Sequence, residues 1–309
     1  MKMSNSLADP VEWLCHGTTL RAIHYAPRHS DFVHQGRAPC IVLAHGLGGV
    51  RTARLDAYAE RFAQAGFHAL AFDYRFFGQS DGQPRQNFNI RAQLDDWASA
   101  IAFARELPGV DAGRIALWGS SFSGGHVVVA AAEDGHIQAV SSQGPMMDGR
   151  AAFLNVLRYA GVGQGLRLSA HAVLDALMSP LGKRHTIALV AAPGEVGVMT
   201  SADAVSGYTA IASEDWHNTI TSSWLLQLPL YRPIRYARRL PCPILIGICM
   251  QDSVAPVSAA EALAKRAGAR AQICRYDVGH FDIYVGAAFE QAVADQIAFF
   301  TEKLGASPH

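Results

Sequence analysis

The sequence predicts an α/β fold in which a mostly parallel, twisted sheet is flanked by helices. Short apolar runs of strand length alternate along the chain with segments that repeat apolar residues at helical spacing, and this pattern is typical of parallel sheets. The alternation stops between residues 150 and 238. We therefore expect an α/β core at 1–149 and 239–309, with a mainly helical cap inserted at 150–238.

Local signals support each element. The run 243–250 (PILIGICM) is continuously apolar, as buried parallel strands are, and the helical spacing at 52–65 ends at Gly66, a natural helix stop. The same reasoning predicts strands at 11–26 (a pair forming an antiparallel edge), 39–44, 68–74, 114–118, 137–141, 243–250 and 271–278, and helices at 52–65, 90–107, 126–132, 259–267 and 289–303. Within the cap it predicts helical segments at 151–159, 166–178 and 221–228, and a glycine-rich loop at 193–210.

Ser121 lies where an apolar strand turns sharply into a helix. Gly119 follows the strand at 114–118, and Phe122 opens the helical run. Such a turn pushes the serine hydroxyl clear of the sheet, which suits a nucleophile. Ser120 is expected to point toward the adjacent strand, and Ser123 to lie in the first helical turn. The alternative is a glycine-serine connection without chemistry.

A serine becomes a good nucleophile only when a base removes its proton and a third group orients that base. Asp252 follows the strand at 243–250, and His280 follows the strand at 271–278. Because the carboxyl ends of parallel strands meet at one edge of the sheet, we expect Ser121, Asp252 and His280 to converge there. Asp148 is the rival acid, one strand further from the histidine loop.

The oxyanion of an acyl-transfer intermediate needs two preorganised N–H donors. One is expected from Phe122, at the helix N-terminus that follows the serine. The other is expected from Leu47, in the glycine-rich turn HGLGG (45–49) after an apolar strand. His45 is interpreted as a structural residue that fixes this turn.

Four apolar residues near this edge are predicted to bind substrate. Met146 and Met147 follow the strand at 137–141, and the adaptable side chain of methionine suits a binding wall. Trp224 and Leu225 lie in a helical segment of the cap. The alternative is that such cap residues only pack the cap against the core.

Five motifs carry a family resemblance: HGLGG (45–49), DYRFFGQSDG (73–82), GSSFSGG (119–125), QDSVAP (251–256) and VGHFD (278–282). Together they resemble the α/β-hydrolase family, over nearly all of the chain outside the cap. The resemblance implies a serine hydrolase with Ser121, His280 and Asp252 in the triad roles. Ser123 departs from the family pattern G-x-S-x-G, which has glycine at that position.

Composition narrows the classes of partner. The 309 residues include 26 basic and 26 acidic side chains with no basic stripe, which argues against nucleic acid. The N-terminus lacks the apolar stretch of a signal peptide, and no apolar run reaches membrane-spanning length, so we expect a cytoplasmic protein without a membrane span. The five cysteines lack metal-ligand spacing and are expected to be buried thiols. A homodimer is left open.

These features predict a serine esterase that cleaves a carboxylic ester with an apolar acyl or alcohol moiety. Its partner would be a small-molecule ester or thioester, and acyl transfer through Ser121 requires no metal and no cofactor. Thioesterase, amidase, peptidase and acyltransferase activities would use the same three residues and stay open. A non-catalytic small-molecule binding module on this fold is the alternative from another class.

Overall fold

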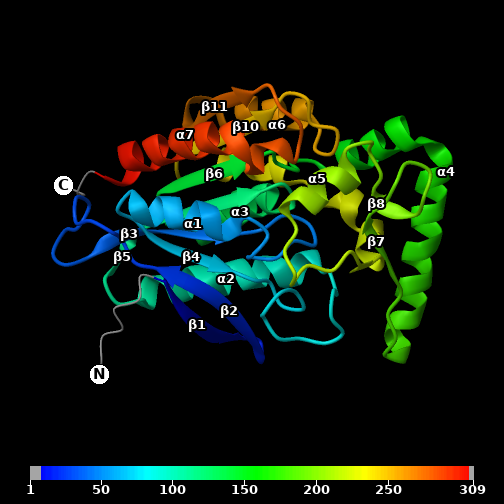
Figure 1. The fold of residues 1–309 in the computed structure, drawn as a ribbon, viewed down its shortest axis with the longest axis horizontal. Coiled ribbons are helices and arrows are strands. Elements are labelled where there is room, and N and C mark those ends of the chain that lie inside the picture. The colour runs from blue at the N-terminus through cyan, green and yellow to red at the C-terminus, as the bar shows by residue number, and fades with distance from the viewer. Residues whose placement is uncertain (1–7, 306–309) are drawn as a thin grey trace.

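The computed structural model describes residues 8–305 and has the predicted α/β architecture (Figure 1). Eight strands form one sheet in the order β1-β2-β4-β3-β5-β6-β10-β11. β2 pairs antiparallel with both β1 and β4, and the remaining pairs are parallel. The strands are β1 (Ala8–Cys15), β2 (Thr18–Tyr25), β3 (Ala38–Ala44), β4 (His68–Phe72), β5 (Val110–Ser120), β6 (Ala139–Gln143), β10 (Ile244–Cys249) and β11 (Ala271–Tyr276).

Helices cover both faces of this sheet. Helices α1 (Leu55–Gln64) and α7 (Gly286–Leu304) pack on one face, and α2 (Ile90–Glu106), α3 (Phe122–Asp134) and α6 (Val257–Ala267) pack on the other. Successive side chains of a strand point to opposite faces. In β3, for example, Val42 joins the core on the α3 side and Leu43 joins the core on the α1 side. Strands β3 and β10 are apolar along their whole length, as is typical where both faces of a strand are covered.

Helix α3 begins at Phe122, as the turn at Ser121 predicts, four residues before the apolar run at 126–132. Its first turn contains Gly124 and Gly125, which are poor helix formers. These glycines let α3 lie close to the loop after β6, because added Cβ atoms would come within 2.8 Å of Pro145 and 2.4 Å of the Met146 carbonyl. The close packing therefore stabilises a helix start that propensity alone would not predict.

The segment between β6 and β10, called here the inserted segment (residues 144–243), lies beyond the carboxyl ends of the central strands (Figure 1). It is less helical than predicted, since β8 (Gly197–Met199), β7 (Thr186–Val190) and β9 (Ile220–Thr221) form a small sheet in that order. The prediction of a loop at 193–210 is wrong at β8 and at its end, where α5 (Ala204–Ile211) forms. The other elements are α4 (Gly149–Met178) and the short 3-10 helices η1 (Ser179–Leu181), η2 (Ser223–Leu226), η3 (Leu228–Leu230) and η4 (Pro233–Arg239).

One further prediction for this segment needs correction. The predicted helix at 221–228 is the end of the short strand β9 followed by 3-10 turns, and the pairing of Thr221 with Thr186 of β7 holds the start of the segment extended. The two predicted helices at 151–159 and 166–178 are present as the two arms of α4. Gly161 separates them, because its backbone (φ 81°, ψ 167°) is not helical and kinks the chain there.

Within the part of the chain that the structure describes, no helix is both long enough and apolar enough to span a bilayer. Across residues 8–305, no three His, Cys, Asp or Glu side chains are grouped so as to hold a metal ion. The five cysteines are free thiols; four are buried, and Cys274 is half-buried.

Candidate active site

Ser121 connects β5, which ends at Ser120, to α3, which begins at Phe122. Its backbone takes φ 56° and ψ −119°, and such strained conformations cost a non-glycine residue about 1–3 kcal/mol. Two backbone hydrogen bonds to the end of β6 hold the turn. The Ser121 N–H donates to the Gln143 carbonyl (2.8 Å), and the Met146 N–H donates to the Ser121 carbonyl (2.9 Å). The strained turn is thus fixed by its neighbours.

The two neighbouring serines are engaged elsewhere. The Ser120 hydroxyl is 2.5 Å from the Tyr284 hydroxyl, and the Ser123 hydroxyl is 2.9 Å from the Tyr74 hydroxyl. Both serines are buried. Of these three serines, Ser121 is the one whose hydroxyl meets a histidine.

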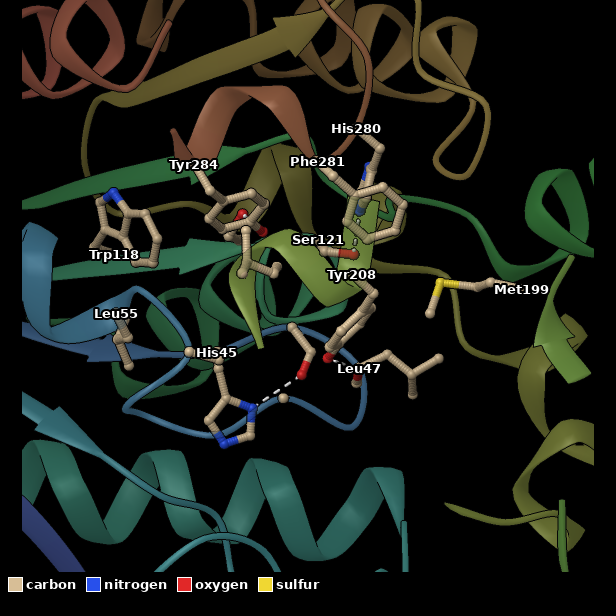
Figure 2. A pocket seen from close by; sticks show the side chains of 15 residues that line it. His45, Leu47, Leu55, Trp118, Ser121, Met199, Tyr208, His280, Phe281 and Tyr284 are labelled. Carbon is tan, nitrogen blue, oxygen red and sulfur yellow. Dashed lines mark hydrogen bonds between the residues drawn. The ribbon is translucent and has the colours of Figure 1, made fainter. Parts of the chain in front are cut away.

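His280 lies between Ser121 and Asp252. Its Nε2 is 3.0 Å from the Ser121 Oγ (Figure 2), and its Nδ1 is 2.7 Å from the Asp252 Oδ2. The other carboxylate oxygen accepts the backbone N–H groups of Val254 (2.8 Å) and Ala255 (2.6 Å). Because an ionised carboxylate can only accept, Nδ1 carries the proton. Nε2 is therefore left to accept the proton of the Ser121 hydroxyl.

The His280–Asp252 pair is shielded from water, with side chains 4% and 2% exposed. Burial alone lowers the pKa of His280, but the charge and hydrogen bond of Asp252 outweigh burial and leave this pKa raised. The imidazole is therefore a stronger base than its burial alone would allow. The carboxylate also compensates the positive charge that the ring gains when it takes a proton.

The turn after β3 lies directly against Ser121. A Cβ at Gly46 would come within 2.8 Å of the Ser121 Cβ, so this close approach requires glycine. Burial lowers the pKa of His45 to about 4, so the ring is neutral near pH 7, and its Nδ1 donates to the Gly46 carbonyl (3.0 Å). The C=O and N–H of one trans peptide point in opposite directions. This bond therefore turns the N–H of Leu47 away from His45.

Leu47 and Phe122, the two predicted oxyanion donors, both line the cavity at Ser121. Phe122 is the first residue of α3, where a backbone N–H has no acceptor within its own helix. The N-terminal end of a helix also carries partial positive charge. An anionic oxygen beside Ser121 would meet favourable dipoles here.

Tyr208 is a residue of this site that the sequence did not indicate. It lies in α5, and its hydroxyl donates to the Leu47 carbonyl (3.0 Å; both residues are labelled in Figure 2). Its ring stacks on Trp216, with centroids 4.8 Å apart. The stretch around Tyr208 has the glycine content of a loop, and no pattern in it points to a residue 161 positions earlier.

Two cavities meet at Ser121, and Leu47, Ser121 and Met199 line both. The first, called the histidine-side pocket, is shown in Figure 2; its other lining residues include Trp118, Tyr208, His280, Phe281 and Tyr284. The second, called the helix-side pocket, is also lined by Phe122, Met146, Ala152, Val156, Tyr159, Val198, Trp224, Leu228, Val254 and Ala255. A substrate carbonyl at Ser121 would therefore have space on both sides.

The structure brings only two of the four predicted substrate-binding residues to this pocket, Met146 and Trp224. The indole N–H of Trp224 is buried and has no acceptor among residues 8–305. Met147 is fully buried away from both pockets, and its carbonyl accepts the N–H of Ile234 (3.0 Å). Leu225 instead lines a third cavity beside α4, which adjoins the helix-side pocket.

Asp148, the rival acid, is occupied elsewhere. One of its carboxylate oxygens accepts the Arg150 N–H at the start of α4 (2.9 Å), and the carboxylate pairs with Arg232 (2.7 Å). The carboxylate that contacts His280 belongs to Asp252.

Comparison with known proteins identifies relatives along most of the chain. The chain is 42% identical over 264 residues to the quorum-quenching protein AidA of Acinetobacter baumannii, which covers 84% of this chain and 85% of that protein. It is 28% identical over 294 residues to the thiohydrolase aneE of Aspergillus aculeatus, which covers 88% of each.

The fold is shared with solved structures. The α/β hydrolase GrgF from a Penicillium species superposes with a TM-score of 0.81 at 21% identity, covering 97% of this chain and 99% of that one. The family model described as serine aminopeptidase, S33, matches residues 35–283. The chain therefore belongs to this family of α/β hydrolases and is an enzyme of that class.

Proposed function

We propose that this protein is a serine hydrolase that cleaves a carboxylic ester with an apolar acyl or alcohol moiety. The observation that carries the proposal is the continuous chain of contacts from Ser121 through His280 to Asp252, at 3.0 and 2.7 Å. The apolar walls of the two pockets support an apolar substrate. In this proposal, residues 150–238 act as a cap that supplies part of those walls.

The reaction proceeds in two steps. His280 takes the proton of the Ser121 hydroxyl as its oxygen attacks the carbonyl carbon, and the N–H groups of Leu47 and Phe122 stabilise the oxyanion. His280 then gives that proton to the leaving oxygen, and the C–O bond breaks to leave an acyl-enzyme. Water, deprotonated by His280, attacks the acyl-enzyme; the bond from the acyl carbon to the Ser121 oxygen breaks, His280 returns the proton to that oxygen, and the carboxylic acid is released. Asp252 holds the imidazole and stays ionised throughout.

Thioester cleavage is the second candidate. It is supported by the relative named a thiohydrolase, which aligns with 88% of the chain. The same groups serve a thioester, with a sulfur in place of the leaving oxygen. The two candidates are separated by comparing kcat/KM for an oxygen ester and a thioester of the same acyl group.

The test of the proposal is the rate with p-nitrophenyl butyrate, together with labelling by a fluorophosphonate, which reacts only with an activated serine. We expect wild type to be active and labelled. We expect Ser121→Ala to lose both, because the nucleophile is absent. Ser123→Ala, a matched control two residues away, is expected to keep the label. An unchanged rate in Ser121→Ala, or a wild-type protein that is neither active nor labelled, would refute the proposal.

A further inference from the structure

A third cavity, with apolar walls, adjoins the helix-side pocket inside the inserted segment. This far cavity lies between α4 and the η2–η3 turn, and it is lined by residues of both. It shares three lining residues with the helix-side pocket, namely Val156, Val198 and Leu228. The two cavities therefore adjoin across these three side chains, called here the neck, and the direction from Ser121 through the helix-side pocket points toward the far cavity.

The far cavity is lined almost entirely by apolar side chains. No charged side chain lines it, and Ser169 is its one polar side chain. The Ser169 hydroxyl donates to the Gly165 carbonyl of its own helix (2.8 Å), so its donor is already used. Leu168 and Ala172 of α4 are 7% and 0% exposed and close the cavity on the α4 side. An aliphatic chain fits this lining, whereas a polar group would lose its hydration without compensation.

The chemistry decides which part of a substrate points in this direction. His280 must reach the leaving atom to protonate it, and His280 lines the histidine-side pocket but not the helix-side pocket. The leaving group therefore belongs on the histidine side. The acyl group extends the other way from Ser121, past Phe122 and Trp224.

We propose that the substrate carries a linear aliphatic acyl chain, long enough to pass the neck and end in the far cavity against Ala172. This inference rests on the proposed ester or thioester hydrolysis and adds to it the class of acyl group. The neck and the far cavity would then determine chain-length preference. Each methylene that becomes buried should raise kcat/KM about three- to fourfold until the far cavity is full.

The experiment measures kcat/KM for p-nitrophenyl esters from acetyl to dodecanoyl. Wild type is expected to prefer a chain longer than butyryl. Ala172→Phe fills the far cavity, and we expect at least a tenfold loss on the preferred chain with acetyl and butyryl esters cleaved as by wild type. Ala170→Phe is the matched control, since it makes the same substitution on an exposed position of the same helix and should keep the wild-type profile.

A second variant keeps the test decisive if Ala172→Phe fails to fold. Leu168→Ala enlarges the far cavity, so its preferred chain should be longer than that of wild type. Profiles of Ala172→Phe and Leu168→Ala that coincide with wild type, or a loss in Ala172→Phe that is equal at all chain lengths, would overturn the assignment. Cleavage of short esters with no gain from longer chains would refute this inference alone, whereas absence of any ester or thioester cleavage would refute the proposed function as well.

Discussion

The contact between Tyr208 and Leu47 links the inserted segment to the turn that we expect to stabilise the oxyanion. Burial raises the pKa of Tyr208 far above its usual value, so the phenol stays protonated and donates to the Leu47 carbonyl. His45 holds the carbonyl of the preceding residue. The two peptide units on either side of Leu47 are therefore each held by a hydrogen bond. The variant Tyr208→Phe removes one of these bonds and keeps the ring.

The expected size of the effect follows from the type of bond that is lost. A neutral hydrogen bond contributes about 0.5–1.5 kcal/mol, which corresponds to about a 2- to 12-fold change in rate if it is felt fully in the transition state. Loss of an oxyanion donor itself costs about 10²–10³ in kcat. Tyr208→Phe only loosens the donor, so we expect kcat to fall about fivefold. KM should change little, because the ring that lines the pocket remains.

The assay compares kcat and KM for p-nitrophenyl butyrate in wild type, Tyr208→Phe and Tyr236→Phe. Tyr236 lies in η4 and loses the same atom away from the turn, so this control should match wild type. A change confined to KM would mean that Tyr208 only forms a wall of the pocket. A loss in kcat beyond 100-fold would mean that its hydroxyl contacts the reacting atoms. Either result would refute the positioning role.

Three further predictions concern single side chains. Asp252→Asn removes the group that raises the pKa of His280. We expect kcat to fall by about 10⁴ and the rise of kcat/KM with pH to move to lower pH. A pH profile identical to that of wild type would contradict this prediction. The indole N–H of Trp224 is buried beside the helix-side pocket and lacks an acceptor among residues 8–305. Trp224→Phe removes no hydrogen bond and keeps an aromatic ring, so kcat/KM for plain acyl esters should stay within about twofold of wild type, and a loss of more than tenfold would argue against it. Asp175 is a fully buried carboxylate 2.7 Å from the Arg184 guanidinium. We expect Asp175→Asn to lower the free energy of unfolding, measured by urea denaturation, by about 3 kcal/mol. A loss below about 1 kcal/mol would mean that this ion pair is dispensable for stability.

The core could be predicted from the sequence because its strands are buried on both faces. Strand β10, for instance, reads as an uninterrupted apolar run, and its six residues are all buried. The convergence of Ser121, Asp252 and His280 could also be predicted, since each follows a parallel strand and the carboxyl ends of such strands share one edge. The homodimer and the cytoplasmic location stay predictions.

The inserted segment could not be predicted as well because its elements depend on distant partners. Strand β9 is only two residues long and pairs with β7 more than thirty positions earlier. So short a run carries no periodicity, and its pairing cannot be predicted from the sequence.

The hydrogen-bond partner of Ser123 could not be predicted either. This serine stands where the family has glycine, and its hydroxyl finds Tyr74, which in turn accepts the Trp97 indole N–H (2.7 Å).

The inserted segment contributes to rate and to selectivity through different residues. Tyr208 contacts the oxyanion turn, whereas Ala172 lines the far cavity, which adjoins the helix-side pocket at Val156. A change at Tyr208 should therefore slow esters of every chain length by the same factor. A change at Ala172 should slow only esters whose chains reach it. Because one change affects catalysis and the other affects recognition of the acyl chain, their effects on the activation free energy for long-chain esters should add in the double variant. Strong non-additivity would mean that the acyl chain itself moves the oxyanion turn.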